Sequence, residues 1–121
     1  MNAQVQITHE GDYIVVRTEG EDNHQSIVGL WQAAAMACGD YNCKKVLGIS
    51  KMAGMTMLEA YRHFEILTDV GIDRDYRIAW VKENPEELEK LRVVETVLAS
   101  RGFYQARVFS NVAEAKQWLL E

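Results

Sequence analysis

The sequence predicts one α/β domain over residues 1–121, with its elements in the order β-β-α-β-α-β-α-β-α. From Tyr76 onward, short apolar runs alternate with helical periodicities that each begin at a capping residue, and few residues are left for loops. Strands that are joined by a single helix run parallel. We therefore expect a five-stranded, mostly parallel sheet with an antiparallel N-terminal hairpin strand and four helices mainly on one face.

The strands are predicted from alternation and from turn residues. Val5 and Ile7 alternate with polar residues, which is typical of a half-buried strand. A turn signal at residues 10–12 precedes a second apolar run over residues 13–19, so we expect these two strands to form a hairpin. The remaining predicted strands cover residues 45–50, 77–82 and 105–109.

Each helix is predicted from a capping residue that is followed by an apolar stripe. Thr56 and Glu59 have the spacing of a capping box, and Asn84 is followed by Pro85, which is favoured in the first helical turn. The predicted helices begin at Asp22, Thr56, Asn84, and Ser110 or Asn111, and the first three end at Gly39, Gly71 and Gly102.

Composition and charge limit the classes of function. The net charge is -5, the pI is near 5.2 and the sequence has no basic run, so we expect no nucleic-acid partner. No apolar run approaches the roughly 20 residues of a membrane span. The N-terminal segment lacks the features of a secretory signal, so the predicted location is cytoplasmic.

Residues with catalytic or metal-binding chemistry form no motif. His9, His24 and His63 are far apart in the sequence, and His63 is expected on the solvated side of its helix. Cys38 and Cys43 lack the further ligands of a zinc site, so we interpret them as free thiols, with a redox pair as the alternative. We expect no catalytic residue, metal or cofactor, although a cleft with several convergent titratable groups would favour an enzyme.

Several segments resemble one known family. The chain is similar to the SpoIIAA-like group of STAS-type domains (sulfate transporter and anti-sigma-factor antagonist), and the resemblance covers nearly its whole length. It implies a non-enzymatic regulatory module that acts through protein–protein contacts. The segments that carry it are Tyr-Arg-Ile-Ala-Trp-Val at 76–81, Arg-Gly at 101–102, Ala-Arg-Val-Phe at 106–109 and Ala-Glu-Ala-Lys-Gln-Trp-Leu at 113–119.

The resemblance also implies a phosphorylated serine or threonine at the start of the helix after the third strand. Residues 50–56 contain Thr56 near that place, and Ser50 is a second candidate, but the family's usual Asp-Ser-Ser/Thr-Gly pattern is missing. Gly48 stands where an acidic residue is common in the family. Thr56 is therefore interpreted either as a phospho-acceptor or as a helix cap, and the two roles are compatible.

Three methionines, Met52, Met55 and Met57, lie in or beside the loop after the third strand. Methionine adapts to irregular apolar surfaces. The loop is predicted either to cover a pocket for a small apolar or lipid-like ligand, to form a docking patch, or to fold onto the core. The related Sec14-like architecture binds lipids, which favours the pocket by analogy.

Trp80 lies in the middle of a predicted strand. If its side chain faces away from the helices, it is a candidate interface residue, and if it lies under them, it belongs to the core. Helices on one face leave the other face partly open, which predicts a protein partner or a homodimer. The alternative is that one helix wraps around to cover that face.

Overall fold

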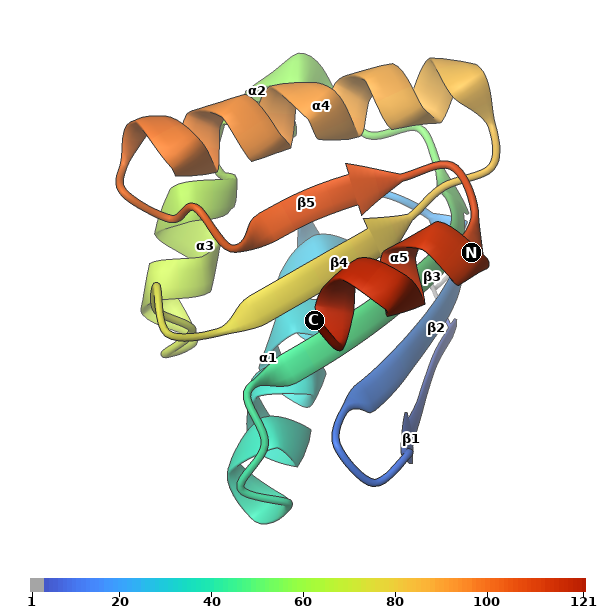
Figure 1. Ribbon diagram of the computed structural model, residues 1–121. Coiled ribbons are helices and arrows are strands. Elements are labelled where there is room, and N and C mark those ends of the chain that lie inside the picture. Colours follow the sequence, from blue (N-terminus) through green and yellow to red (C-terminus); the bar gives the residue numbers. More distant parts are fainter. Residues whose placement is uncertain (1–3) are drawn as a thin grey trace.

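The computed structural model describes residues 4–121 and confirms the α/β class (Figure 1). The strands are β1 (Gln4–His9), β2 (Ile14–Glu21), β3 (Lys45–Ala53), β4 (Arg77–Val81) and β5 (Ala106–Phe109). The helices are α1 (His24–Asp40), α2 (Met57–Tyr61), α3 (His63–Asp69), α4 (Pro85–Ser100) and α5 (Val112–Leu119). Among the described residues, no helix is long and apolar enough to cross a membrane.

The sheet has the strand order β1-β2-β3-β4-β5, in which β1 is antiparallel to β2 and the other pairs are parallel. The predicted hairpin and the predicted parallel strands are thus confirmed. β3 runs three residues beyond its predicted end, because residues 51–53 continue to pair with residues 19–21 of β2.

Helices α1 to α4 lie on one face of the sheet, and α5 lies on the other (Figure 1). Each of the three crossovers joins neighbouring parallel strands, so all three pass over the same face when they share the usual right hand. α5 follows the last strand and returns across the opposite face, where Ala115 and Leu119 are fully buried against Val15, Leu47 and Ala79. The alternative of a helix that wraps around is therefore the observed one.

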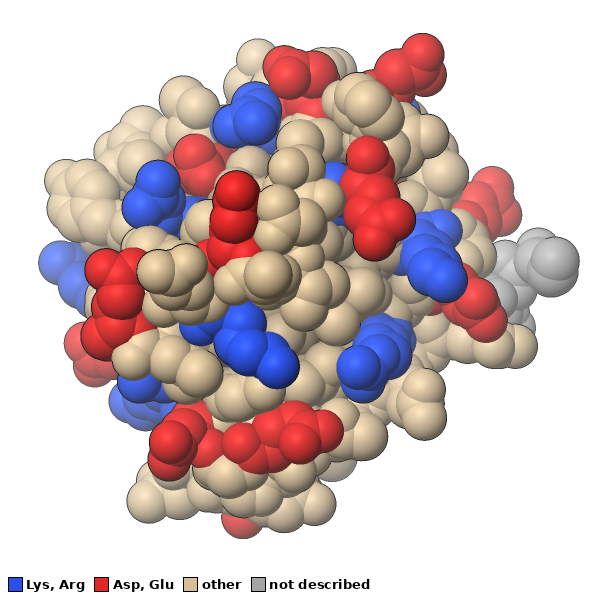
Figure 2. Space-filling view, turned by 45° about the vertical axis from the view of Figure 1, so that its right-hand side comes forward, with Lys and Arg blue, Asp and Glu red and all other residues tan. Residues whose placement is uncertain are grey.

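Arg77 holds α5 in place. Its guanidinium lies 3.8 Å from the centre of the Trp118 ring and donates a hydrogen bond of 2.7 Å to the carbonyl oxygen of Trp118. Beyond α5, the same face of the sheet carries exposed polar side chains, including Arg17 and Lys51. Figure 2 shows basic and acidic side chains interspersed with neutral ones on the side of the molecule in view.

The predicted N-terminal helix caps are confirmed with one exception, and the predicted end of the first helix at Gly39 was wrong, because α1 continues to Asp40 and Tyr41 is its C-cap. Thr56 and Glu59 form both hydrogen bonds of a capping box, and Asn84 accepts hydrogen bonds from the two amides that follow Pro85. The start at Asp22 was wrong, because the side chain of Asn23 caps α1 and accepts from the amide of Ser26. Asp22 directly precedes this cap, and it is buried.

The single helix predicted after Thr56 is broken at Arg62 into α2 and α3. The two helices present different sets of side chains to the core. Ala60 is the buried residue of α2, whereas α3 buries His63, Ile66 and Leu67.

Candidate functional site

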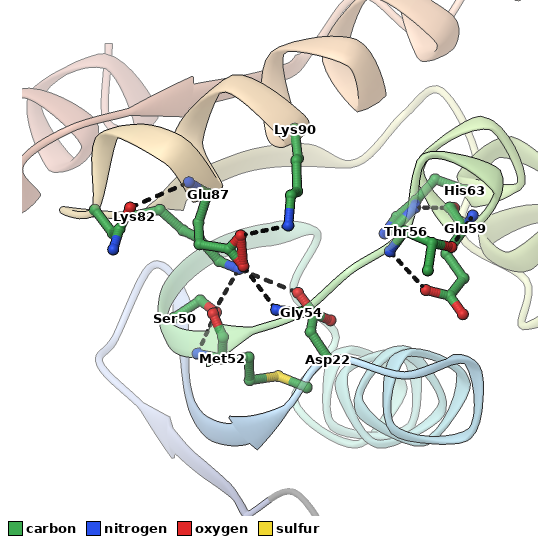
Figure 3. Close-up of polar contacts among 11 residues, drawn as sticks. Asp22, Ser50, Met52, Gly54, Thr56, Glu59, His63, Lys82, Glu87 and Lys90 are labelled. Carbon is green, nitrogen blue, oxygen red and sulfur yellow. Dashed lines mark hydrogen bonds and ion pairs between the residues drawn. The ribbon is translucent and has the colours of Figure 1, made fainter.

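A cluster of buried polar residues lies at the carboxyl ends of the parallel strands. Asp22 directly follows β2, Lys82 directly follows β4, and the end of β3 lies between them. Ligands of open α/β sheets bind beside this edge of the sheet. The cluster and its neighbours on α2, α3 and α4 are drawn in Figure 3.

Lys82 and Asp22 form a buried ion pair. The Lys82 Nζ lies 3.1 Å from the Asp22 carboxylate and donates a second hydrogen bond of 2.8 Å to the carbonyl oxygen of Met52. The two side chains are 3% and 7% exposed. The amide of Asp22 also donates to the carbonyl of Ala53. The pair therefore joins β2, β3 and β4 at the point where the methionine loop begins.

Glu87, in the first turn of α4, fixes the other side of this loop. Its carboxylate accepts a hydrogen bond of 2.8 Å from the amide of Gly54 and lies 2.8 Å from the Lys90 Nζ. Burial alone would raise the pKa of the Glu87 carboxyl, but the Lys90 and Gly54 hydrogen bonds outweigh it and the pKa lies below its usual value. The loop is thus clamped from β4 and from α4.

His63 is buried, so its predicted position on the solvated side was wrong. The cause is the helix break at Arg62, after which α3 begins and turns His63 toward the core. The Nδ1 atom lies 2.8 Å from the carbonyl oxygen of Glu59. Burial lowers the pKa of His63, and the Glu59 hydrogen bond and the charge of Asp22 only partly oppose this shift. The imidazole is therefore neutral at neutral pH.

A cavity of about 40 Å³ lies between the sheet and the helices α1, α3 and α4. Its wall is mostly apolar and includes Met52 and Met55, which are both 2% exposed. Asp22, Ser50 and His63 border it as polar residues. Met52 and Met55 thus fold onto the core, which was one of the predicted roles of the loop. They also line a cavity, which the predicted ligand pocket requires.

Trp80 lies under the helices and forms part of the cavity wall. Its ring centre is 4.8 Å from that of Trp31 on α1. Gly48 lies beside it on β3, and a Cβ atom at Gly48 would be 1.9 Å from the Trp80 ring. The indole therefore requires glycine at this position.

The two candidate phospho-acceptors differ in access. Ser50 is 8% exposed, and its hydroxyl accepts a hydrogen bond from the amide of Met52, so a kinase has no access to it while β3 is intact. Thr56 is exposed, and its hydroxyl accepts from the amide of Glu59 at 3.3 Å. The Glu59 carboxylate accepts from the amide of Thr56 in return. Thr56 is thus a cap whose hydroxyl is at the surface.

An exposed apolar surface lies directly beside Thr56. Met57, Leu58 and Tyr61, the α2 surface, are 50%, 60% and 61% exposed although all three are large and apolar. Met57 was expected in or near this region, whereas Leu58 and Tyr61 were missed. The sequence carried no signal for them, because no glycine or proline marks the break that leaves α2 with five residues, of which only Ala60 is buried.

The buried cluster was also missed. The sequence predicts Asp22 as a helix start and Lys82 as the end of a strand, and neither prediction includes a contact between the two. A lysine after the apolar run Ile-Ala-Trp-Val is the one signal that could have been used, because a buried charge needs a partner. Titratable groups do converge here, but Asp22 pairs with Lys82 and Glu87 with Lys90, so their charges are already neutralised.

The cysteines and the metal-binding residues add no chemistry within residues 4–121. Cys38 and Cys43 are free thiols, and burial, with a smaller effect of Cys43, raises the pKa of Cys38 to about 11. No group of His, Cys, Asp and Glu side chains in the described part of the chain could hold a metal ion. A comparison with protein-family models finds no match, and a search among curated proteins finds no significant relative.

Proposed function

We propose that the chain is a binding and regulatory module of STAS type that acts through a protein partner docked on the α2 surface. The observation that carries this proposal is the exposure of Met57, Leu58 and Tyr61 side by side on one short helix. Exposed apolar patches on a folded chain mark interaction sites, and tyrosine is enriched among the residues that dominate binding. The proposed partner accordingly presents an apolar face.

The clamped loop supports this role. The segment before α2 is held by Lys82 and by Glu87, so the α2 surface is presented in one position. A surface that is ordered before binding loses less conformational entropy when a partner docks. The buried polar cluster therefore acts, in this proposal, as the support of the binding surface.

Matched substitutions test the proposal. Tyr61→Ser and Leu58→Ser remove apolar area from α2, whereas Tyr104→Ser and Leu120→Ser remove the same side chains at exposed positions elsewhere. Each variant is used to capture proteins from the host. A partner that the native chain and both control variants retain, and that both α2 variants lose, supports the proposal. Equal loss in all four variants, or equal retention, contradicts it.

Thr56 is the proposed regulatory residue of this surface. A phosphate on its hydroxyl would displace the hydrogen bond to the Glu59 amide and would stand beside the Glu59 carboxylate. We expect Thr56→Glu to weaken docking and Thr56→Ala to leave it nearly unchanged. If neither substitution alters any interaction of the captured partner, Thr56 is a cap only.

A second candidate function is that of a carrier or sensor of a small apolar ligand. The cavity beside Met52, Met55 and Trp80 favours it. A lipid-like ligand is much larger than about 40 Å³, so a small ligand fits this cavity better. Native mass spectrometry of protein from its own host tests this function, since a carrier would show extra mass that disappears on denaturation.

The same spectrum reads the oligomeric state. The homodimer was predicted from an open sheet face, but α5 covers the apolar residues of that face. A homodimer, if formed, would therefore use the α2 surface, and it remains a proposal together with the cytoplasmic location.

A further inference from the structure

The cavity wall carries a hydrogen-bond acceptor with no partner in the described part of the chain. His63 borders the cavity and is 5% exposed. Its Nδ1 lies 2.8 Å from the carbonyl of Glu59, which can only accept, so the proton of the neutral ring is on Nδ1. Nε2 then carries the free lone pair. The second backbone group in contact with the ring, the carbonyl of Ala60, can only accept, so neither backbone contact supplies a donor to this lone pair.

The charged groups on the cavity border are already engaged. Asp22 is paired with Lys82, whose ammonium also donates a hydrogen bond to the carbonyl oxygen of Met52. Glu95 accepts a hydrogen bond of 2.7 Å from the amide of Val108 on the edge strand β5. The guanidinium of Arg107 lies 5.5 Å from the ring of Trp118, on the opposite face of the sheet. An anionic ligand would thus find no free cation in the cavity, and the Glu95 carboxylate is already held by the Val108 amide.

The rest of the wall suits an apolar body. The rings of Trp31 and Trp80 meet there, and Met52 and Met55 complete a surface that adapts its shape. A volume of about 40 Å³ exceeds by about threefold the space that one water needs, so it admits a molecule of a few heavy atoms. Glu95 of α4 and Val108 of the edge strand β5 are half-buried and border the cavity, so it meets the surface between α4 and β5.

We propose that this cavity binds a small uncharged molecule with an apolar body and one hydroxyl or N–H group that donates to Nε2 of His63. A short-chain alcohol is the simplest member of this class. The inference rests on the second candidate function, and it adds the polarity of the ligand and the residue that selects it.

The test compares 2-butanol with butanone, which have the same skeleton but differ in that only the alcohol donates a hydrogen bond. Binding is followed by NMR through the indole N–H signals of Trp31 and Trp80, with Trp118 on the other face as the internal reference. We expect 2-butanol to bind about tenfold more tightly than butanone, as one hydrogen bond predicts. The 15N signal of His63 Nε2 should shift with the alcohol alone.

Variants separate the parts of the inference. His63→Leu should remove the preference for the alcohol, whereas His24→Leu at an exposed histidine should keep it. Ala106→Val narrows the cavity and should weaken both compounds. Equal affinities in the native protein, or a preference that survives His63→Leu, would overturn the donor assignment and leave the cavity function standing. If neither compound shifts Trp31 or Trp80, the inference and the second candidate function both fail.

A misfolded His63→Leu variant would not leave the question open, because the 15N signal of the native histidine reports the hydrogen bond directly. A shift of this signal with 2-butanol and none with butanone supports the assignment. The same shift with both compounds, or with neither while the tryptophan signals move, contradicts it.

Discussion

Lys82→Met should be among the most damaging single substitutions in this protein. Methionine keeps most of the length of the side chain but removes the ammonium, so the carboxylate of Asp22, which is 7% exposed, is left without a counter-charge. The carbonyl of Met52 also loses its donor. Removal of one partner from a buried ion pair costs about 3–5 kcal/mol of unfolding free energy.

The size of this loss can be converted to temperature. For a chain of 121 residues, the unfolding entropy near the melting point means that each kcal/mol lost from the unfolding free energy lowers the melting temperature by about 4 °C. The variant should therefore melt about 12–20 °C below the native protein. The matched control is Lys44→Met, because Lys44 lies 4.0 Å from Asp75 with both side chains more than half exposed. That change should cost less than about 1 kcal/mol.

The effect is measured by urea unfolding of Lys82→Met, of Asp22→Asn and of the double variant Asp22→Asn/Lys82→Met. The double variant removes both charges, so it should be more stable than Lys82→Met, and the two single losses should not add. A loss below about 1 kcal/mol for Lys82→Met would refute the reasoning, since it would mean that the pair adds no more than an exposed one. Strict additivity in the cycle would refute it as well.

Three further substitutions follow from the same region. Gly48→Ala forces the new Cβ into the Trp80 ring and should lower the free energy of unfolding in urea by about 1–3 kcal/mol. Gly29→Ala, at an open position on α1, should raise it by about 0.5–1 kcal/mol, and similar effects at both sites would contradict the packing argument. Burial lowers the pKa of His63, so the stability that the neutral imidazole contributes is complete above the unfolded pKa of about 6.5 and is lost as the pH falls toward the folded pKa. The melting temperature of His63→Gln should therefore depend less on pH in this range, and an unchanged pH dependence would mean that another group causes it. Glu87→Gln should lose about 1.5–3 kcal/mol and should speed hydrogen exchange at the Gly54 amide, and unaltered exchange there would show that the loop does not depend on this carboxylate.

Elements that depend on local interactions were predictable from the sequence. The capping box of Thr56 and Glu59 and the cap at Asn84 are contacts between residues two or three apart, so the residue types alone specify them. The parallel direction of strands β2, β3, β4 and β5 was also predictable, because a helical crossover returns the chain to the edge of the sheet at which the preceding strand began.

The faces on which side chains lie were harder to predict. Trp80 could have faced either side, because a shift of one residue in strand register exchanges the two faces. His63 depended on the break at Arg62, which no glycine or proline marks. For both residues, packing against distant elements fixes the strand register or the helix break, and this determines whether a large side chain lies in solvent or in the core.

By itself, the sequence determined the α/β class, the order of the elements and most of the caps, since periodicity and capping act within a few residues. Only the tertiary structure decided that Asp22 and Lys82 form a pair across 60 positions of the chain. It also decided that α5 covers the face left open by the other helices. These features depend on which strands become neighbours and on which carboxyl ends meet, so they arise only when the whole sheet has assembled.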